Sequence, residues 1–135
     1  MATPTVAEGG CLCGAIRYRV SDAPLFSVIC HCATCRKASG APSVAWVTFN
    51  RSEVQILTAE PQRYRSSPAV LRRFCGKCGT AISYEHAATA PTIDLTTISL
   101  DDPNVFPPTG EVWLEHRVPW VAVNPTLHQH PRGGG

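Results

Sequence analysis

Hydrophobic and polar residues alternate over many short stretches of this chain, which is the pattern of β-strands with one buried face. The clearest stretch is residues 15–20, where Ile16, Tyr18 and Val20 share one face. Other short apolar or alternating runs are separated by proline, glycine and aspartate, as strands commonly are. These further predicted strands cover residues 25–29, 43–49, 53–57, 62–65, 70–74, 79–85, 93–100 and 111–115. Many short strands without an internal repeat predict a mainly β fold of short antiparallel sheets.

One stretch predicts a helix. Residues 33–39 are long enough for about two helical turns, contain Arg36 and Lys37, and are followed by Gly40, a common residue at the C-terminus of a helix. We expect Cys35 in the first turn of this short helix. Backbone N–H groups and nearby cations favour the thiolate form of a cysteine at that position.

The two ends of the chain carry no periodic pattern. We expect a flexible arm over residues 1–8, a single domain over residues 9–124, and a flexible tail over residues 125–135 with His128 and His130 exposed to solvent. At 135 residues and 44% hydrophobic, the chain can form one hydrophobic core of modest size. A structural metal ion would add stability to such a small domain.

Two tryptophans are expected to be buried. Trp46 lies in a predicted strand soon after a cysteine-rich loop, where it can belong to the core or form the wall of a pocket. Trp120 follows the last predicted strand, and we expect it to pack beneath that strand.

Charge and hydropathy argue against a nucleic-acid or membrane partner. The net charge is +2, and the longest run of arginines is Arg72–Arg73, with no interleaved aromatic residues. No apolar run approaches the roughly 20 residues needed to span a bilayer, and residues 1–10 carry no apolar targeting segment. We therefore expect a cytoplasmic protein with reduced thiols. The oligomeric state, a homodimer included, is left open by the sequence.

The seven cysteines fall into three tight groups, with spacings that aim sulfurs at a common point. Cysteines one residue apart on an extended chain point to the same side, and cysteines three apart lie on the two arms of a tight turn. Structural zinc sites have four protein ligands, whereas catalytic zinc sites have three and an open position. We therefore predict two zinc ions per chain. The structural ion would bind Cys11, Cys13, Cys75 and Cys78, and the catalytic ion would bind Cys30, Cys32 and Cys35.

A second structural site is the main alternative for the three-cysteine group. His31, His86 or the pair His128 and His130 could supply a fourth ligand and close the site. A disulfide framework fits less well, because seven is odd and the spacings are too short for local pairing. The spacing also matches neither ferredoxin pattern for an iron–sulfur cluster.

The sequences around the three cysteine groups resemble those of one known family. The matching motifs are Gly10-Cys-Leu-Cys-Gly-Ala-Ile16, Cys30-His-Cys-Ala-Thr-Cys-Arg-Lys-Ala-Ser-Gly40 and Phe74-Cys-Gly-Lys-Cys-Gly-Thr80. Together they resemble the glutathione-dependent formaldehyde-activating enzymes, and the similarity extends from about residue 9 to Trp120. Near the C-terminus this chain has Glu111 where the family commonly has a histidine. It has Asn124-Pro125-Thr126 where an acidic residue and a glycine are usual.

The resemblance implies a fold of the Mss4-like type built around a structural and a catalytic zinc ion. It also implies the activity for which the family is named, joining formaldehyde to glutathione to give S-hydroxymethylglutathione, which is a carbon–sulfur lyase reaction run in reverse. Three thiolates and a divalent zinc ion sum to a charge of −1, which favours a soft thiol as the fourth ligand.

The predicted function is therefore that of a zinc-dependent carbon–sulfur lyase or synthase. Its substrates would be adducts of glutathione, or a similar thiol, with formaldehyde or another small carbonyl compound. Arg36 or Lys37 would hold a substrate carboxylate, and His31, Ser39 or Glu85 would move the proton. The alternative is a binding or chaperone module of Mss4-like fold in which both zinc ions are structural and no reaction is catalysed.

Overall fold

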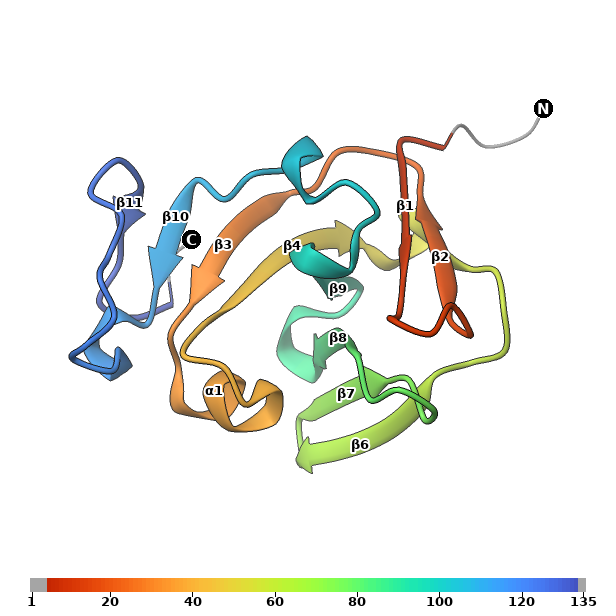
Figure 1. Cartoon of the computed structure of the whole chain (residues 1–135), viewed down its shortest axis with the longest axis horizontal. Coiled ribbons are helices and arrows are strands. Elements are labelled where there is room, and N and C mark those ends of the chain that lie inside the picture. Colours follow the sequence, from red (N-terminus) through yellow and green to blue (C-terminus); the bar gives the residue numbers. More distant parts are fainter. Residues whose placement is uncertain (1–4, 134–135) are drawn as a thin grey trace.

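The structure, a computed structural model, describes residues 5–133 and arranges their strands in two sheets (Figure 1). The smaller sheet has the strand order β1-β2-β5, and the larger has the order β11-β10-β3-β4-β9-β8-β7-β6. The strands are β1 (Ala7–Gly10), β2 (Arg17–Val20), β3 (Phe26–Cys30), β4 (Val44–Asn50), β5 (Val54–Ile56), β6 (Gln62–Ser67), β7 (Val70–Phe74), β8 (Ala81–His86), β9 (Thr92–Thr96), β10 (Gly110–Val112) and β11 (His128–Gln129). Neighbouring strands are antiparallel, except that β10 runs parallel to both β3 and β11. The predicted mainly β, antiparallel fold is confirmed.

The main core lies between the two sheets. Tyr18 and Val20 on β2 are fully buried, as their alternation with arginines predicts. They pack in one hydrophobic cluster with Val47 and Phe49 of β4 and Leu95 of β9. The small sheet therefore contributes one side of this core and the large sheet the other.

A second, smaller cluster underlies the three-cysteine group. Cys30, Cys35, Trp46 and Val112 are buried together there. Antiparallel pairing of β3 with β4 places Val28 opposite Trp46, so the strand that ends at Cys30 lies beside the strand that carries the tryptophan. Trp113 packs against the same cluster.

The predicted helix is confirmed as α1 (Ala33–Ser39). The Cys32 side chain accepts a hydrogen bond from the Cys35 N–H at the start of the helix, and Gly40 ends it in the left-handed region with φ 68°. At seven residues, α1 is too short to cross a bilayer, and no other helix of residues 5–133 is long and apolar enough to do so.

Two predicted strands end earlier than expected. The strand predicted over residues 93–100 stops at Thr96, because a short 3₁₀ turn follows in which the Ser99 hydroxyl donates to the Thr96 carbonyl. The strand predicted over residues 111–115 stops at Val112, because Trp113 adopts a left-handed conformation with φ 57°. A 3₁₀ helix, Leu114–His116, then leads the chain away from the sheet.

The chain ends also differ from the expected arm and tail. Residues 7–10 form β1, whereas residues 1–4 of the expected arm lie outside the described residues. In the C-terminal segment, β11 pairs with β10, and the His130 N–H donates to the Glu111 carbonyl. The prediction for Trp120 is wrong, because its side chain is 77% exposed. The aromatic residue packed near the last strand is Trp113 instead.

Candidate metal sites and the adjoining cavity

Four of the cysteines come together from two distant segments. Cys11 and Cys13 lie between β1 and β2, while Cys75 and Cys78 lie between β7 and β8. The Sγ atoms of Cys11 and Cys13 are 3.6 Å apart, and those of Cys13 and Cys75 are 3.7 Å apart. A tetrahedral site with zinc–sulfur bonds of about 2.3 Å places its sulfurs about 3.8 Å from one another. These four residues could therefore hold one metal ion, as the spacing predicts.

The backbone around the four-cysteine site supports thiolates. The Ile16 N–H donates to Cys11 Sγ at 3.2 Å, and the Cys78 N–H donates to Cys75 Sγ at 3.4 Å. Thr80 Oγ1 lies 3.2 Å from Cys78 Sγ, and this contact helps to lower the pKa of Cys78 to about 5. The same oxygen accepts the Leu12 N–H, so it also joins the two cysteine turns.

The other three cysteines form a cluster from one continuous segment. Cys30 is the last residue of β3, Cys32 precedes α1, and Cys35 lies in the first turn of α1. Their sulfurs lie within 4.8 Å of one another. The pKa of Cys32 is lowered by hydrogen bonds from Cys30 and Cys35, whereas its bond to Cys32 raises the pKa of Cys30. The two neighbouring cysteines therefore favour the thiolate form of Cys32.

No fourth protein ligand joins the three-cysteine cluster within residues 5–133. The His31 ring is 1% exposed, and its Nε2 lies 2.8 Å from Glu111 Oε1. His86 Nδ1 accepts the Ala88 N–H, and His128 lies on β11. The histidines considered as closing ligands therefore do not complete the cluster.

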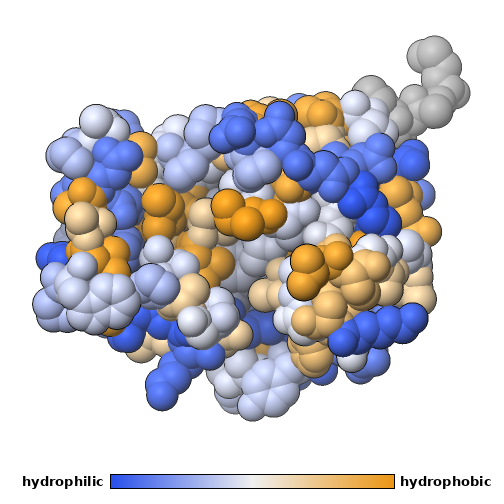
Figure 2. Space-filling view, in the orientation of Figure 1, coloured by the Kyte–Doolittle hydropathy of each residue, from blue (hydrophilic) through white to orange (hydrophobic). Residues whose placement is uncertain are grey.

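A cavity of about 740 Å³ adjoins the cluster at Cys35. It lies among α1, β4, β6, β7 and β8, and Figure 2 shows the hollowed surface in the orientation of Figure 1. Trp46 forms part of its wall while also belonging to the buried cluster, so both expectations for this residue are met. No aspartate or glutamate is among the described residues that line the cavity. Lys37, Arg63, Arg72 and Arg73 do line it, and since within residues 5–133 only Arg73 among them is ion-paired with glutamates, the cavity is cationic.

Arg72 is the cavity residue that sequence reasoning missed. Its Nη2 lies 4.0 Å from Cys35 Sγ, and its guanidinium carbon lies 4.9 Å from the centroid of the Tyr84 ring. The one feature of the sequence that could have pointed to Arg72 is its place in a short predicted strand that leads directly into Cys75. Only the pairing of β7 with β8 and the approach of α1 bring that arginine to the cysteine cluster.

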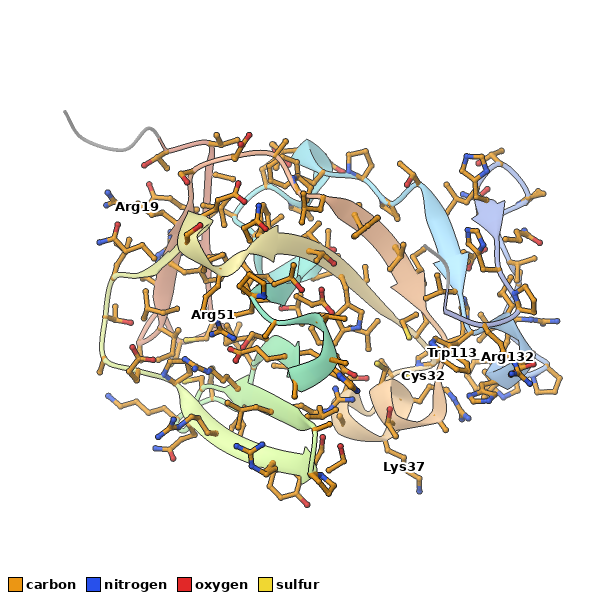
Figure 3. All side chains as sticks on the ribbon, turned by 180° about the vertical axis from the view of Figure 1, so that it is seen from behind. Arg19, Cys32, Lys37, Arg51, Trp113 and Arg132 are labelled. Carbon is orange, nitrogen blue, oxygen red and sulfur yellow. The ribbon has the colours of Figure 1, made fainter. Side chains whose placement is uncertain are left out.

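The predicted binding residues on α1 are placed differently from each other. Lys37 lines the cavity, whereas Arg36 is not among the lining residues. In Figure 3, which views the molecule from behind, the Lys37 side chain points away from the body of the protein. Lys37 therefore lies at the rim of the cavity.

The three residues predicted to move the proton lie in different places, and only one of them lines the cavity. Ser39 lines the cavity, and its hydroxyl donates to the Cys35 carbonyl at 2.7 Å. His31 is buried against Glu111. Glu85 does not line the cavity; its carboxylate lies 2.6 Å from Arg51 and 3.4 Å from Arg73.

Comparison with known proteins shows the family to which this chain belongs. Residues 6–116 match the family model for glutathione-dependent formaldehyde-activating enzymes. The chain belongs to this family. The matched region includes both cysteine clusters, the helix and the walls of the cavity.

A curated family relative is a protein of Halomonas elongata named "Putative glutathione-dependent formaldehyde-activating enzyme". It is 28% identical over 127 residues, which cover 86% of this chain and 80% of the relative. A crystal structure of a Rhodobacter sphaeroides protein has the same fold, with a TM-score of 0.60 at 21% identity. The match covers 76% of this chain and 99% of that one.

Proposed function

We propose that this member of the family is a zinc-dependent carbon–sulfur lyase or synthase. It would join glutathione, or a similar thiol, to formaldehyde or another small carbonyl compound, and would also cleave such adducts. The observation that carries the proposal is the three-cysteine cluster, which has no fourth ligand within residues 5–133 and adjoins a cationic cavity. The name of the family and that of the Halomonas elongata relative support the choice of thiol and carbonyl compound.

Zinc suits both sets of sulfur ligands. Thiolates are soft ligands that select zinc over harder ions such as magnesium or calcium. A bound zinc ion would supply Lewis acidity that lowers the pKa of an incoming thiol. Cys30, Cys32 and Cys35 would hold the ion in the reactive site, and Cys11, Cys13, Cys75 and Cys78 would hold the structural one.

The proposed reaction forms one carbon–sulfur bond. The sulfur of the thiol adds to the carbonyl carbon, the π pair of the C=O bond moves to oxygen, and the proton of the thiol ends on that oxygen. With formaldehyde and glutathione the product is S-hydroxymethylglutathione. The reverse reaction returns the proton to sulfur and releases the carbonyl compound, so no oxidant or reductant is needed.

The residues around the cluster would bind the substrate, accept its proton and hold the cysteine loop in place. The cations of the cavity would attract the carboxylates of glutathione. Ser39 is the predicted proton carrier that lines the cavity, and its hydroxyl would relay the proton to water. His31, through Glu111, would fix the loop between Cys30 and Cys32.

The direct test follows exchange of ¹³C-labelled formaldehyde with S-hydroxymethylglutathione by NMR. We expect the zinc-loaded protein to accelerate exchange on the order of 100-fold or more. We expect Cys32→Ser to return it to the spontaneous rate. Cys32→Ser should keep its fold, because the four-cysteine site is untouched. Zinc-loaded wild type that leaves the exchange rate unchanged would contradict the proposal and favour a non-catalytic binding module.

A further inference from the structure

Arg72 is held beside the three-cysteine cluster without the help of an acidic residue. Its Nε donates to Ser66 Oγ at 3.3 Å, its guanidinium carbon lies 4.9 Å from the Tyr84 ring centroid, and its Nη2 approaches Cys35 Sγ at 4.0 Å. No carboxylate of the described residues lies within salt-bridge distance of it. The side chain is therefore positioned, but its charge is not neutralised by aspartate or glutamate.

The neighbouring arginine shows the contrast. Arg73 also lines the cavity, but it leaves β7 on the opposite face from Arg72, because successive side chains of a strand alternate. Arg73 is 3.0 Å from Glu60 and 3.4 Å from Glu85. Glu60 and Glu85 thus pair with Arg73, and neither carboxylate forms an ion pair with Arg72.

We infer that Arg72 binds a carboxylate of the substrate and makes the protein specific for thiol adducts that carry one close to the reacting sulfur. This inference rests on the proposed function and names its substrate class. A guanidinium presents a planar pair of donors that matches a carboxylate, and stacking on Tyr84 restricts its orientation. The carboxylate can belong to the thiol, as at the glycine end of glutathione, or to the carbonyl compound, as in a 2-oxo acid.

A competing role for Arg72 is to balance the charge of the cluster. Three thiolates with a divalent ion carry a net charge of −1, and a nearby cation would stabilise that charge. In that role Arg72 would affect metal retention and would not distinguish ligands with and without a carboxylate.

The test is calorimetric binding to zinc-loaded protein, using glutathione and glutathione diethyl ester as matched probes. Wild type should bind glutathione roughly 10- to 100-fold more tightly than the diester, as expected for a charge-assisted hydrogen bond. Arg72→Met should abolish most of this preference, and Arg72→Lys should keep part of it, because the charge remains but the planar fork is lost. Arg65→Met is the control: Arg65 lies on the adjacent strand β6, is exposed and does not line the cavity.

A second pair of probes separates the two sources of the carboxylate. Adducts of the diester with glyoxylate and with formaldehyde differ only in a carboxylate on the carbonyl side. An Arg72-dependent preference for glyoxylate assigns the carboxylate to the carbonyl compound, whereas a preference only for glutathione over its diester assigns it to the thiol. Either result supports the inference.

Equal binding changes for all probes in Arg72→Met, or no change, would overturn it. Loss of one zinc in Arg72→Met together with an unchanged probe preference in Arg72→Lys would also overturn it, and would assign charge balance instead. Glutathione and its diester are bound without any carbonyl compound and therefore without turnover, so the two proposals fail separately. Wild type that prefers glutathione through Arg72 but does not accelerate formaldehyde exchange would contradict only the proposed reaction.

Discussion

A buried polar pair anchors the loop that carries the three-cysteine cluster. His31 and Glu111 are 1% and 3% exposed, and Glu111 Oε2 also accepts the Asn124 N–H at 2.7 Å. The glutamate therefore joins the cysteine loop, β10 and the C-terminal segment. Neither Glu111 nor Asn124 lines the cavity, so the contact has a structural role.

Glu111→Ala tests this anchor. Removing the Glu111 carboxylate leaves the buried His31 ring and the Asn124 N–H without their hydrogen-bond partner, so the free energy of unfolding should fall by about 1–3 kcal/mol for each lost bond. Glu60→Ala removes a carboxylate that is 72% exposed, and should cost no more than about 1 kcal/mol. Urea unfolding of the zinc-loaded variants measures both. Similar losses in the two variants would show that the buried pair is no anchor.

Asp94 should make stability depend on pH. Burial raises its pKa, and the hydrogen bond from the Thr48 hydroxyl opposes this only in part. As pH rises, the unfolded chain loses this proton first, near the ordinary value of 3.8. The contribution of Asp94 to stability is therefore greatest below that value and is lost as pH rises through the raised pKa of the folded state.

Asp94→Asn removes that titration while leaving an oxygen for Thr48. The melting temperature of the variant relative to wild type should rise with pH through this interval and then level off. Circular dichroism melts of both proteins at matched pH values provide the measurement. A difference that stays constant with pH would mean that Asp94 does not titrate abnormally.

At the level of elements, local signals predicted α1 and much of the β structure. Helix α1 ends in a left-handed conformation at residue 40, which glycine adopts easily. A glycine at that position can be read directly from the sequence, so the end of the helix was predictable. Strand ends that depend on side-chain contacts were less predictable, as at the end of β9, where Ser99 bonds to Thr96. Strand β11 was also not predicted. A two-residue strand has no periodicity, and β11 exists through its pairing with β10. The sequence pattern thus predicts a helix or strand well when the residues that end it belong to the same segment.

Gly40→Ala tests the helix end. The added methyl group meets nothing within 4 Å, so its cost is conformational, and we expect about 1–2 kcal/mol from the left-handed φ of 68°. Gly40→Asn should cost less, because asparagine tolerates this region better. Thermal unfolding of the two variants is the measurement, and an alanine variant as stable as wild type would contradict the expected cost.

For the whole molecule, the two cysteine clusters have different structural positions. The four-cysteine site joins the turn between β1 and β2 to the turn between β7 and β8, so it ties the small sheet to the large one. The three-cysteine cluster lies within residues 30–35 and ties no distant segments together. Cysteine spacing predicted both groups. Their surroundings depend on long-range pairing, which is why the strands that line the cavity and the position of Arg72 were not predicted.

Zinc occupancy of serine variants tests the central claim that one sulfur site is a closed scaffold and the other is open. Native mass spectrometry should show two zinc ions per chain in wild type, and one in Cys32→Ser, which should retain its fold. Cys78→Ser should lose the cooperative fold, because it breaks the link between the sheets. Glutathione should add to the two-zinc wild type and not to Cys32→Ser. The account is contradicted if the two variants lose zinc and fold alike, or if glutathione binds Cys32→Ser as it binds wild type.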